Sequence, residues 1–450
     1  MKLPARILPF FLLASSASMY PHLVSATTPA GGAATRRGKS TKKTRTTKAP
    51  SSIKKGTSSK SSNKNSKGSS LKHTNIHLSP GQSIQEALDN ASDNTVIHLR
   101  PGDYTEPDNV LYGLRVTKNN IKLIAPGTGT TRILKDGEQA VGVYAAPEGC
   151  EYNENECSDT LHNFSIQGIV VEGFPKNGIQ TRWVDGFKFI DCQSINNLNN
   201  GLYPTLSMNG IIQGCASSGS LDAAIWVAGS VKVSVVDNEI HDSTTGFEVT
   251  VSKDVHVMNN SIYNNVVGIG MYHANMAGTD PDYPSFDNWV FKDNAIYNNN
   301  RQNDSPAGSF QSFLPNGIGI LMVGVRGQTV RNNHVEGNNL AGILMAGLCT
   351  VQAAAFGQDC EGQNAPRDGD PSANDNRIIG NSFEQNGLQP NANLGLPGKD
   401  ILYIQSQLEF LKPNNNCFQD NISSSEEGGP ASSFATEDFL SEISLPTGGC

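Results

Sequence analysis

The residues with the clearest capacity for chemistry follow a short phrase that recurs between residues 178 and 345. The phrase is a small residue, an apolar residue, any residue, and then usually another apolar one. Its third position holds Gln180, Tyr203, Trp226 and Glu248 in four successive repeats. If the repeats are stacked strands, this position points outward, because strand side chains alternate between two faces. The sequence therefore predicts an outward row of an amide, two aromatic rings and a carboxylate.

Further polar residues border this row. The fifth position of the phrase contributes Arg182, Thr250 and Tyr272, while Asp222 precedes its strand and His273 follows Tyr272. An extended sugar chain suits such a surface, because aromatic faces stack on sugar rings and polar groups bond to hydroxyls. The expected substrate contacts are Gln180, Tyr203, Trp226 and Thr250.

Elimination or C5 epimerisation at a uronate is the first reaction that these residue types fit. Such a reaction needs a base for H5, a proton donor, and a group that neutralises the substrate carboxylate. Arg182 is the candidate neutralising group, because a guanidinium can bind a carboxylate bidentately. The candidates for proton transfer are Glu248, Tyr203, Tyr272 and His273.

Glycoside hydrolysis is the second reaction, and it requires a pair of carboxylates. Asp222 and Glu248 lie one repeat apart, which could separate them by about 5–10 Å, the range of glycosidases. Alternatively, the residues of the outward row are ordinary surface residues without a catalytic role. The chain would then be a non-catalytic polysaccharide-binding or cell-wall protein.

The spacing of the phrase predicts the architecture. Successive phrases begin 23, 23, 22, 22, 49 and 25 residues apart, which indicates a solenoid with one coil per repeat. These steps join Gly178, Gly201, Ala224, Gly246, Gly268, Gly317 and Gly342. A second strand in each coil carries an inward apolar column: Phe189, Ile212, Val235, Val257, Phe291, Val330 and Ile378. A turn column follows, in which stacked Asn side chains can bond along the axis: Cys192, Cys215, Asn238, Asn260, Asn294, Asn333 and Asn381.

Composition divides the chain into four parts. Residues 1–26 are typical of a secretory signal, and residues 27–73 form a Ser-, Thr- and Lys-rich linker without large apolar runs. The linker carries 13 Lys plus Arg and no acid, whereas residues 74–450 carry 19 against 42 acids, a balance of 19 − 42 = −23. Residues 74–411 form the solenoid domain and residues 412–450 a tail. We expect an exported monomer without a membrane span, whose basic linker is a tether or binds an anionic wall polymer.

Eight cysteines in an exported chain favour disulfides. Spacing predicts Cys150–Cys157, Cys349–Cys360 and a tail-binding Cys417–Cys450. Cys192 and Cys215 either bridge adjacent coils or are buried thiols. Sequons for glycosylation occur at Asn90, Asn163, Asn259, Asn303 and Asn421.

A metal is not expected from these cysteines, because none has Cys-x-x-Cys spacing or a nearby His pair. His241, His256 and His334 fall in different columns. Two acidic loops offer hard oxygen ligands for Ca²⁺, although solvated loops are the simpler interpretation. These loops contain Asp280, Asp282 and Asp287, and Asp368, Asp370 and Asp375.

A capping helix at Ile84–Ala91, followed by strand and Pro-Gly-Asp-Tyr104, resembles the pectate-lyase-like superfamily. The segments Asn200-Gly-Leu-Tyr-Pro204, Asp222-Ala-Ala-Ile-Trp-Val-Ala228, Gly246-Phe-Glu-Val249, Asn288-Trp-Val-Phe-Lys-Asp-Asn294 and Pro315-Asn-Gly-Ile-Gly-Ile-Leu-Met322 are similar to a family of exported parallel β-helix repeat proteins without settled activity. The resemblance implies an all-β, single-stranded right-handed parallel β-helix of about ten coils.

The signatures of the well-defined enzyme groups of this superfamily are missing. There is no Asp pair with Gly-His-Gly, no Trp-Ile-Asp-His, and no Asp-Pro-His. Fold alone therefore names no enzyme. The expected function is an extracellular protein active on anionic, uronic-acid-containing polysaccharide, as a lyase or epimerase before a hydrolase. Nucleic acid is not an expected partner.

Overall fold

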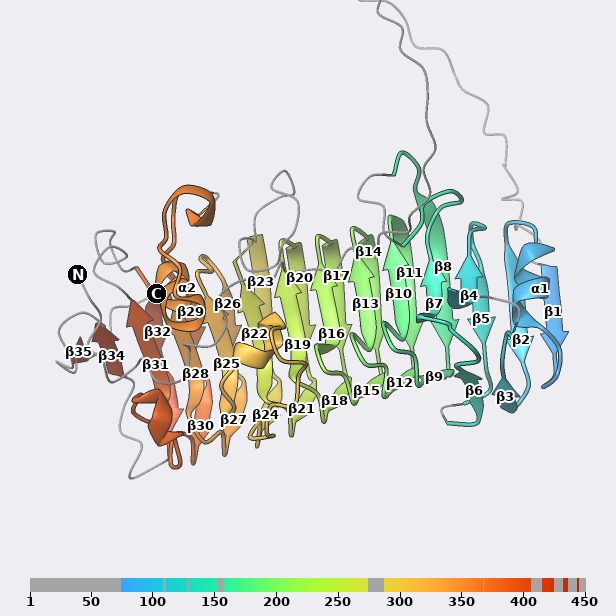
Figure 1. Cartoon of the computed structure of the whole chain (residues 1–450). Coiled ribbons are helices and arrows are strands. Elements are labelled where there is room, and N and C mark those ends of the chain that lie inside the picture. The colour runs from blue at the N-terminus through green and yellow to red at the C-terminus, as the bar shows by residue number, and fades with distance from the viewer. Residues whose placement is uncertain are drawn as a thin grey trace, which may run out of the picture. The chain divides into compact units, whose positions relative to one another are not determined.

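The computed structural model describes residues 74–107, 111–127, 129–152, 157–273, 287–366, 368–405, 415–424, 432–435 and 443–444. The expected signal (1–26) and linker (27–73) lie outside these residues. The described domain is a parallel β-helix in which three sheets run along one axis, and Figure 1 shows the coils stacked side by side. There are about eleven coils, close to the ten expected.

The three sheets have 12, 11 and 12 strands, and we name them A, B and C. Sheet A contains β1 (Thr74–Leu78), β2 (Thr95–Leu99), β5 (Lys122–Ile124), β8 (Leu161–Gln167), β11 (Val184–Ile190), β14 (Met208–Gln213), β17 (Val231–Val236), β20 (Lys253–Met258), β23 (Asp287–Lys292), β26 (Thr329–Arg331), β29 (Arg377–Ile379) and β32 (Cys417–Gln419). Sheet B contains β3 (Gly102–Tyr104), β6 (Thr131–Leu134), β9 (Val170–Glu172), β12 (Gln193–Ile195), β15 (Ala216–Ser218), β18 (Glu239–His241), β21 (Ser261–Tyr263), β24 (Ala295–Tyr297), β27 (His334–Glu336), β30 (Ser382–Glu384) and β33 (Ile422–Ser423). Sheet C contains β4 (Tyr112–Val116), β7 (Val141–Ala145), β10 (Ile179–Arg182), β13 (Leu202–Thr205), β16 (Ala223–Ala228), β19 (Thr245–Thr250), β22 (Val267–Tyr272), β25 (Ile318–Val323), β28 (Ala341–Ala346), β31 (Lys399–Gln405), β34 (Ser432–Ala435) and the antiparallel β35 (Ile443–Ser444).

Helices are few and short. They are α1 (Ile84–Asp89), α2 (Leu348–Phe356) and the 3₁₀ turns η3 (Phe310–Phe313), η4 (Gly362–Asn364) and η5 (Ala392–Leu394). The predicted capping helix is confirmed as α1. The Ser83 hydroxyl accepts from the Glu86 N–H at 2.9 Å, and the Glu106 carboxylate accepts from the Ile84 N–H at 2.6 Å. An N-cap and an acid at the N-terminus both stabilise a helix start.

The predicted inward columns are confirmed. The sheet A column pairs residue by residue from Phe189 to Ile378, and all its members are buried in one continuous core. One phrase is shifted from the prediction. Ile269 pairs with Ile320, whereas Ile318 pairs with Val267. The equivalent phrase therefore begins at Gly319, and the true steps are 51 and 23 residues, because the preceding insertion is two residues longer than the pattern indicated.

The turn column is an asparagine ladder, as predicted. The side-chain oxygen of each Asn accepts from the backbone N–H of the preceding coil, for example Asn294 from Asn260 at 3.0 Å. The ladder extends to Asn421, which accepts from the Asn381 N–H at 3.0 Å. Sheets A and B thus continue past residue 411, where the sequence pattern fades. A second ladder was not foreseen and runs through Asn265, Asn299, Asn338 and Asn386.

Cys192 and Cys215 do not form the predicted bridge and are buried free thiols. The Cys215 sulfur accepts from the Cys192 N–H at 3.3 Å and so takes the place of an Asn oxygen in the ladder. The two thiols therefore belong to the ladder rather than to a disulfide. Burial raises the pKa of the Cys215 thiol.

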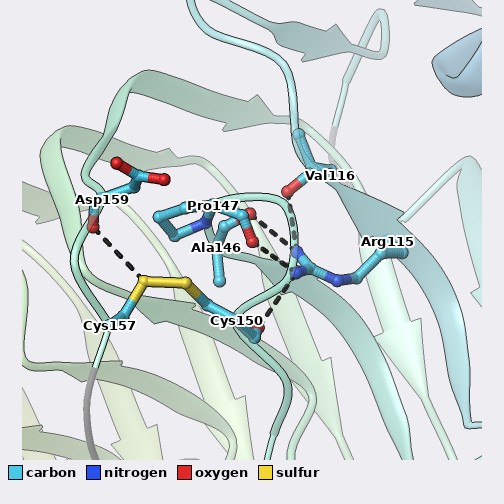
Figure 2. The surroundings of a disulfide bond; sticks show 7 residues. All are labelled: Arg115, Val116, Ala146, Pro147, Cys150, Cys157 and Asp159. Atoms are coloured by element: carbon cyan, nitrogen blue, oxygen red, sulfur yellow. Dashed lines mark hydrogen bonds between the residues drawn. A yellow bond between two sulfur atoms is a disulfide. The ribbon is translucent and has the colours of Figure 1, made fainter.

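The two loop disulfides are confirmed, with Cα–Cα distances of 5.8 Å for Cys150–Cys157 and 5.2 Å for Cys349–Cys360. Cys417 is also disulfide-bonded, while its predicted partner Cys450 lies outside the described residues. Arg115 holds the first loop, as Figure 2 shows. Its guanidinium donates over 2.8–3.1 Å to the carbonyls of Val116, Ala146, Pro147 and Cys150.

Candidate functional site

The outward row exists on sheet C. Gln180 pairs with Tyr203 and Trp226 pairs with Glu248 on neighbouring strands. The rings of Tyr203 and Trp226 stack with centroids 4.7 Å apart and planes 11° apart. The sequence analysis missed the start of the row, because the earlier coils lack the regular phrase. There, Arg115 pairs with Tyr144, and Tyr144 with Gln180.

Glu248 is the most unusual member of this row. Its side chain is on the outer face of the sheet, yet the residue is only 3% exposed. Among the described residues, its Oε2 atom has no hydrogen-bond partner. Burial, and then the negative charge of Asp222, raise the pKa of Glu248 well above its usual value. A carboxyl in this environment keeps its proton to a higher pH than an exposed one and can act as a proton donor.

Asp222 lies at the start of the neighbouring coil and is 9% exposed. The side-chain amide of Gln311 donates to its Oδ1. Burial raises the pKa of Asp222 to about 7, against the opposing effect of hydrogen bonds from Asn200 and Gln311. Asp222 and Glu248 therefore form a pair of buried carboxyl groups, and the surroundings raise the pKa of each.

Two hydroxyl groups complete this cluster, which we call the carboxyl cluster (Asp222, Thr245, Glu248 and Tyr272). The Tyr272 and Thr245 hydroxyls are buried and have no hydrogen-bond partner other than each other among the described residues. Burial and then the charge of Glu248 raise the pKa of Tyr272. Buried polar atoms in folded proteins are nearly always bonded, so the unpartnered Glu248 Oε2 atom beside these hydroxyls indicates a site built for a ligand.

An insertion covers the carboxyl cluster. The Ser305 hydroxyl lies 2.7 Å from the Thr244 hydroxyl and donates to the Leu221 carbonyl at 2.9 Å. The Phe310 ring packs edge-on against Tyr272, with centroids 5.1 Å apart. A long loop on a rigid scaffold is a usual place for binding function. The structure shows that this insertion also removes water from the carboxyl groups.

Thr250 and Gln180 are positioned otherwise than expected for substrate contacts. The buried Thr250 hydroxyl accepts from the Trp226 indole N–H at 3.0 Å, so it supports the indole. Gln180 is buried and accepts from the Asn177 amide at 2.8 Å. Tyr203 and Trp226 are the partly exposed members of the four-residue row.

Arg182 lies away from the carboxyl cluster. Its strand position is aligned with Thr205, Ala228 and Thr250, three coils before the last of these, or about 14 Å along the axis. The guanidinium donates to the Tyr152 carbonyl at 2.7 Å and lies 4.4 Å from the Trp183 ring centroid.

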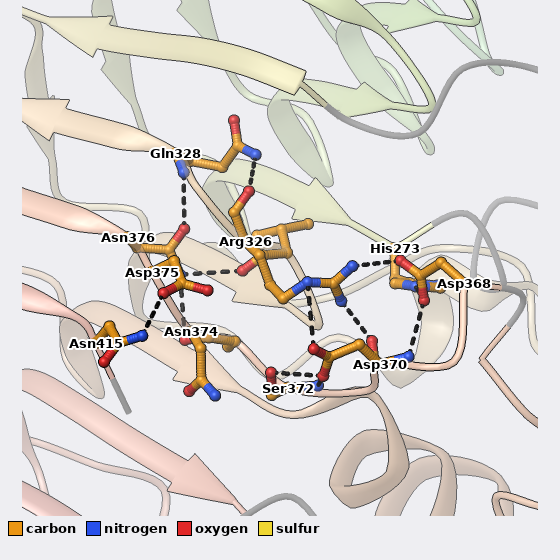
Figure 3. A network of polar contacts seen from close by, with 12 residues as sticks. His273, Arg326, Gln328, Asp368, Asp370, Ser372, Asn374, Asp375, Asn376 and Asn415 are labelled. Atoms are coloured by element: carbon orange, nitrogen blue, oxygen red, sulfur yellow. Dashed lines mark hydrogen bonds and ion pairs between the residues drawn. The ribbon is translucent and has the colours of Figure 1, made fainter. Parts of the chain in front are cut away.

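His273 is committed to a different network, shown in Figure 3. Its Nε2 atom lies 3.3 Å from Asp368 Oδ1, and Asp368 also pairs with Arg326. Although burial opposes ionisation, the bonds from His273 and Arg326 hold the pKa of Asp368 well below its usual value. This network anchors the insertion between α2 and β29 to the coils.

The structure describes the carboxylates of only one of the two acidic loops considered for Ca²⁺. The carboxylates of one loop are already bonded, Asp368 as above, Asp370 to Ser372 at 2.7 Å and Asp375 to Asn415 at 2.9 Å. Asp280 and Asp282, and the side chain of Asp287, lie outside the described residues. One group with three ligand atoms within 4.8 Å of one another occurs in the described part of the chain, on sheet B: His334, Glu336 and Glu384.

The sequons divide into two kinds. Asn90, Asn163 and Asn259 are exposed. The amide nitrogens of the other two are used inside the fold, Asn303 donating to the Gln311 carbonyl at 2.7 Å and Asn421 to the Ile378 carbonyl at 2.8 Å. A glycan on either of these would break the bond.

Comparison with known proteins supports the fold. Residues 177–356 match the family described as the right handed beta helix region. The mannuronan C-5 epimerase A-module of Azotobacter vinelandii is 15% identical, covering 76% of this chain and 90% of its own, with a TM-score of 0.49. The DFA-IIIase of Arthrobacter chlorophenolicus A6 is 14% identical, covering 76% and 82%, with a TM-score of 0.48. The Dettilon tailspike protein is 13% identical, covering 81% of this chain and 60% of the tailspike, with a TM-score of 0.42.

No curated protein has a sequence that matches significantly. Within the described residues, no helix is long and apolar enough to span a membrane. The chain is a right-handed parallel β-helix protein with the pectin-lyase-like fold.

Proposed function

We propose that this protein is an exported polysaccharide-active enzyme whose proton-transfer centre is the carboxyl cluster. The observation that carries the proposal is the buried Glu248 carboxyl, whose Oε2 atom has no hydrogen-bond partner among the described residues, beside a second buried carboxyl, Asp222. Two carboxyl groups whose surroundings give them different proton affinities are the usual acid and base of sugar chemistry. The adjoining Tyr203 and Trp226 rings stack on each other and are partly exposed, so their apolar edges are open to a sugar.

Glycoside hydrolysis fits this cluster best. Glu248, whose pKa is raised by burial, is the acid and donates its proton to the glycosidic oxygen as the bond to the anomeric carbon breaks. Asp222, with a pKa of about 7, accepts a proton from the water that attacks that carbon. The two carboxyl groups and one water therefore balance the reaction without further groups.

The lyase or epimerase reaction expected from the sequence is the second candidate. Arg182 is bound to the Tyr152 carbonyl and lies three coils from Thr250, so it cannot neutralise a uronate carboxylate at Glu248. The protonated Glu248 and Tyr272 are instead the neutral donors that could bind such a carboxylate. This second reaction places the uronate acid group between these two side chains.

The test is a panel of neutral and uronic-acid polysaccharides with three readouts for each polymer. These are new reducing ends, unsaturated ends, and exchange of H5 with deuterated solvent. Reducing ends without unsaturation indicate hydrolysis, unsaturated ends indicate elimination, and H5 exchange without cleavage indicates epimerisation. Binding of a polymer with none of the three products would show a non-catalytic binding protein and contradict the proposal.

A further inference from the structure

We infer that the site takes the end of a glycan chain rather than the middle of one, an inference that rests on the proposed function. The sequence suggested a long row open to an extended polymer. The structure instead has a short open stretch on sheet C, with walls on both sides along the solenoid axis.

The open stretch consists of two neighbouring coils. Tyr203 and Trp226 are partly exposed, and their stacked rings project from adjacent strands 4.7 Å apart at the centroids. Two coils span only about 10 Å along the axis. Their neighbours in the row are buried on both sides, Gln180 at 1% exposure and Glu248 at 3%.

The first wall stands beyond Glu248, toward the C-terminal coils. There the outward positions form a second apolar core on the outside of sheet C, which includes Tyr272, Leu321 and Leu344. Phe310 packs onto this core and against Tyr272. Phe356 of α2 lies next to Phe310 and Phe313, with ring centroids 6.2 and 5.0 Å apart. A glycan chain therefore cannot continue past the carboxyl cluster along the sheet.

The second wall stands on the N-terminal side. Tyr144 is fully buried in a small cluster with Tyr112, Val141 and Ala146, and Tyr152 packs against it. Two guanidinium groups tie this wall down, Arg115 through the carbonyls in Figure 2 and Arg182 through the Tyr152 carbonyl. The row is therefore closed at this end by residues as rigidly held as those of the coils.

The position of the acid pair between these walls decides which part of a substrate can react. Glu248 lies directly against the first wall, with the open aromatic stretch on its other side. The terminal sugar fits next to the carboxyl cluster, while the remaining chain leaves over Trp226 and Tyr203 into solvent. The reaction would then release one or two sugars at a time from a chain end.

The experiment uses the full chain and an oligosaccharide series of one polymer, from disaccharide to octasaccharide, labelled at the reducing end. Calorimetry gives affinity against length, and chromatography of early time points gives the fragments. We expect affinity to level off at the disaccharide or trisaccharide, and the first products to be monosaccharides or disaccharides. Phe310→Ala opens the first wall and should add internal cuts, whereas Tyr297→Ala, on the outside of sheet B, should leave the product pattern unchanged.

Affinity that keeps rising to the octasaccharide, or early products of mixed internal lengths from the wild-type protein, would overturn the inference while leaving the enzyme proposal intact. Affinity that levels off without any turnover would support chain-end binding and sink the catalytic proposal instead. An absence of both binding and turnover on every polymer would overturn both. If Phe310→Ala fails to fold, the dependence of wild-type affinity on oligosaccharide length still distinguishes binding of a chain end from binding of the middle of a chain.

Discussion

Sheets B and C carry the same kinds of side chain on their outer faces, yet in different chemical states. On sheet B, the Tyr263 hydroxyl donates to Glu239 at 2.6 Å, and the rings of His241, Tyr263 and Tyr297 stack at 5.0 Å spacing beside solvent. On sheet C, Tyr272 and Glu248 are buried, and the Glu248 Oε2 atom has no hydrogen-bond partner among the described residues.

The difference comes from the insertions rather than from the coils. Residues 300–316 and α2 cover sheet C near Glu248, while Glu239 on sheet B is exposed. A Glu and a Tyr in contact are an ordinary pair on a solvent-exposed surface. When the same two groups are buried, the loss of water raises the pKa values of both, as is common at functional sites. The coils of the solenoid fix the positions of these side chains, and the insertions that cover them change their pKa values.

The largest expected effect is the loss of turnover in Glu248→Gln. The amide keeps the shape of the side chain but cannot donate a proton as an acid, so we expect kcat to fall by about 10²–10⁴-fold. Glu239→Gln on sheet B is the matched control and should leave kcat unchanged. Equal kcat values for the two variants would contradict the proposed chemical difference between the outer faces of sheets B and C.

Asp222→Asn should reduce turnover and also change the pH dependence of stability. A carboxyl whose folded-state pKa is raised to about 7 stabilises the fold below its unfolded-state pKa, and that contribution is lost as pH rises toward 7. Between about pH 4 and pH 7, wild-type Tm should therefore fall relative to that of the variant, by the equivalent of roughly 1–4 kcal/mol. Parallel Tm curves for the two proteins over this range would contradict the raised pKa.

Trp226→Ala should weaken glycan binding by about tenfold, because one stacked aromatic ring contributes on the order of 1 kcal/mol or more. Tyr263→Ala removes a stacked ring from sheet B and should not change the affinity. Calorimetry with the oligosaccharide bound most tightly by the wild-type protein separates the two. A similar loss in both variants would point to binding on either face.

Gln311→Ala should give the smallest effect, a shift in the pH profile. Its side chain donates to Asp222 and lowers the pKa of that carboxyl. Removing the donor raises this pKa, so the acidic limb of kcat/KM should move to higher pH by up to about one unit. Gln193→Ala on sheet B serves as the control, and a shift to lower pH would show that the account of Asp222 has the wrong sign.

Much of the fold could be predicted from the sequence, because each coil repeats a local rule. The columns through Phe189 and Asn294 follow from alternation and from turn chemistry, and the structure confirms both. Of the two alternatives predicted for Cys192 and Cys215, the structure has buried thiols and not a bridge. The repeat spacing could not decide between them, because it fixes the distance between coils but not the direction of a sulfur. The shifted phrase at Gly319 was missed because an insertion has no period to count.

The candidate site was predicted only in part. Repeat spacing placed Trp226 and Glu248 on adjacent strands, because register is a property of the repeat. The burial of Glu248 could not be foreseen, since it depends on Phe310 and Gln311, which lie outside the repeats. For the same reason, nothing in the pattern showed that His273 would pair with Asp368, which lies far along the chain.

Infrared difference spectroscopy of the Glu248 carboxyl tests the central claim most directly, because it requires no substrate. The wild-type spectrum at neutral pH minus that of Glu248→Gln isolates this group, with Glu239→Gln as the reference for an exposed carboxylate. A carbonyl stretch of a protonated carboxylic acid, present in the wild-type protein and lost in Glu248→Gln, is the predicted result. Carboxylate bands alone, matching those lost in Glu239→Gln, would show that Glu248 is ionised and would contradict its role as the proton donor.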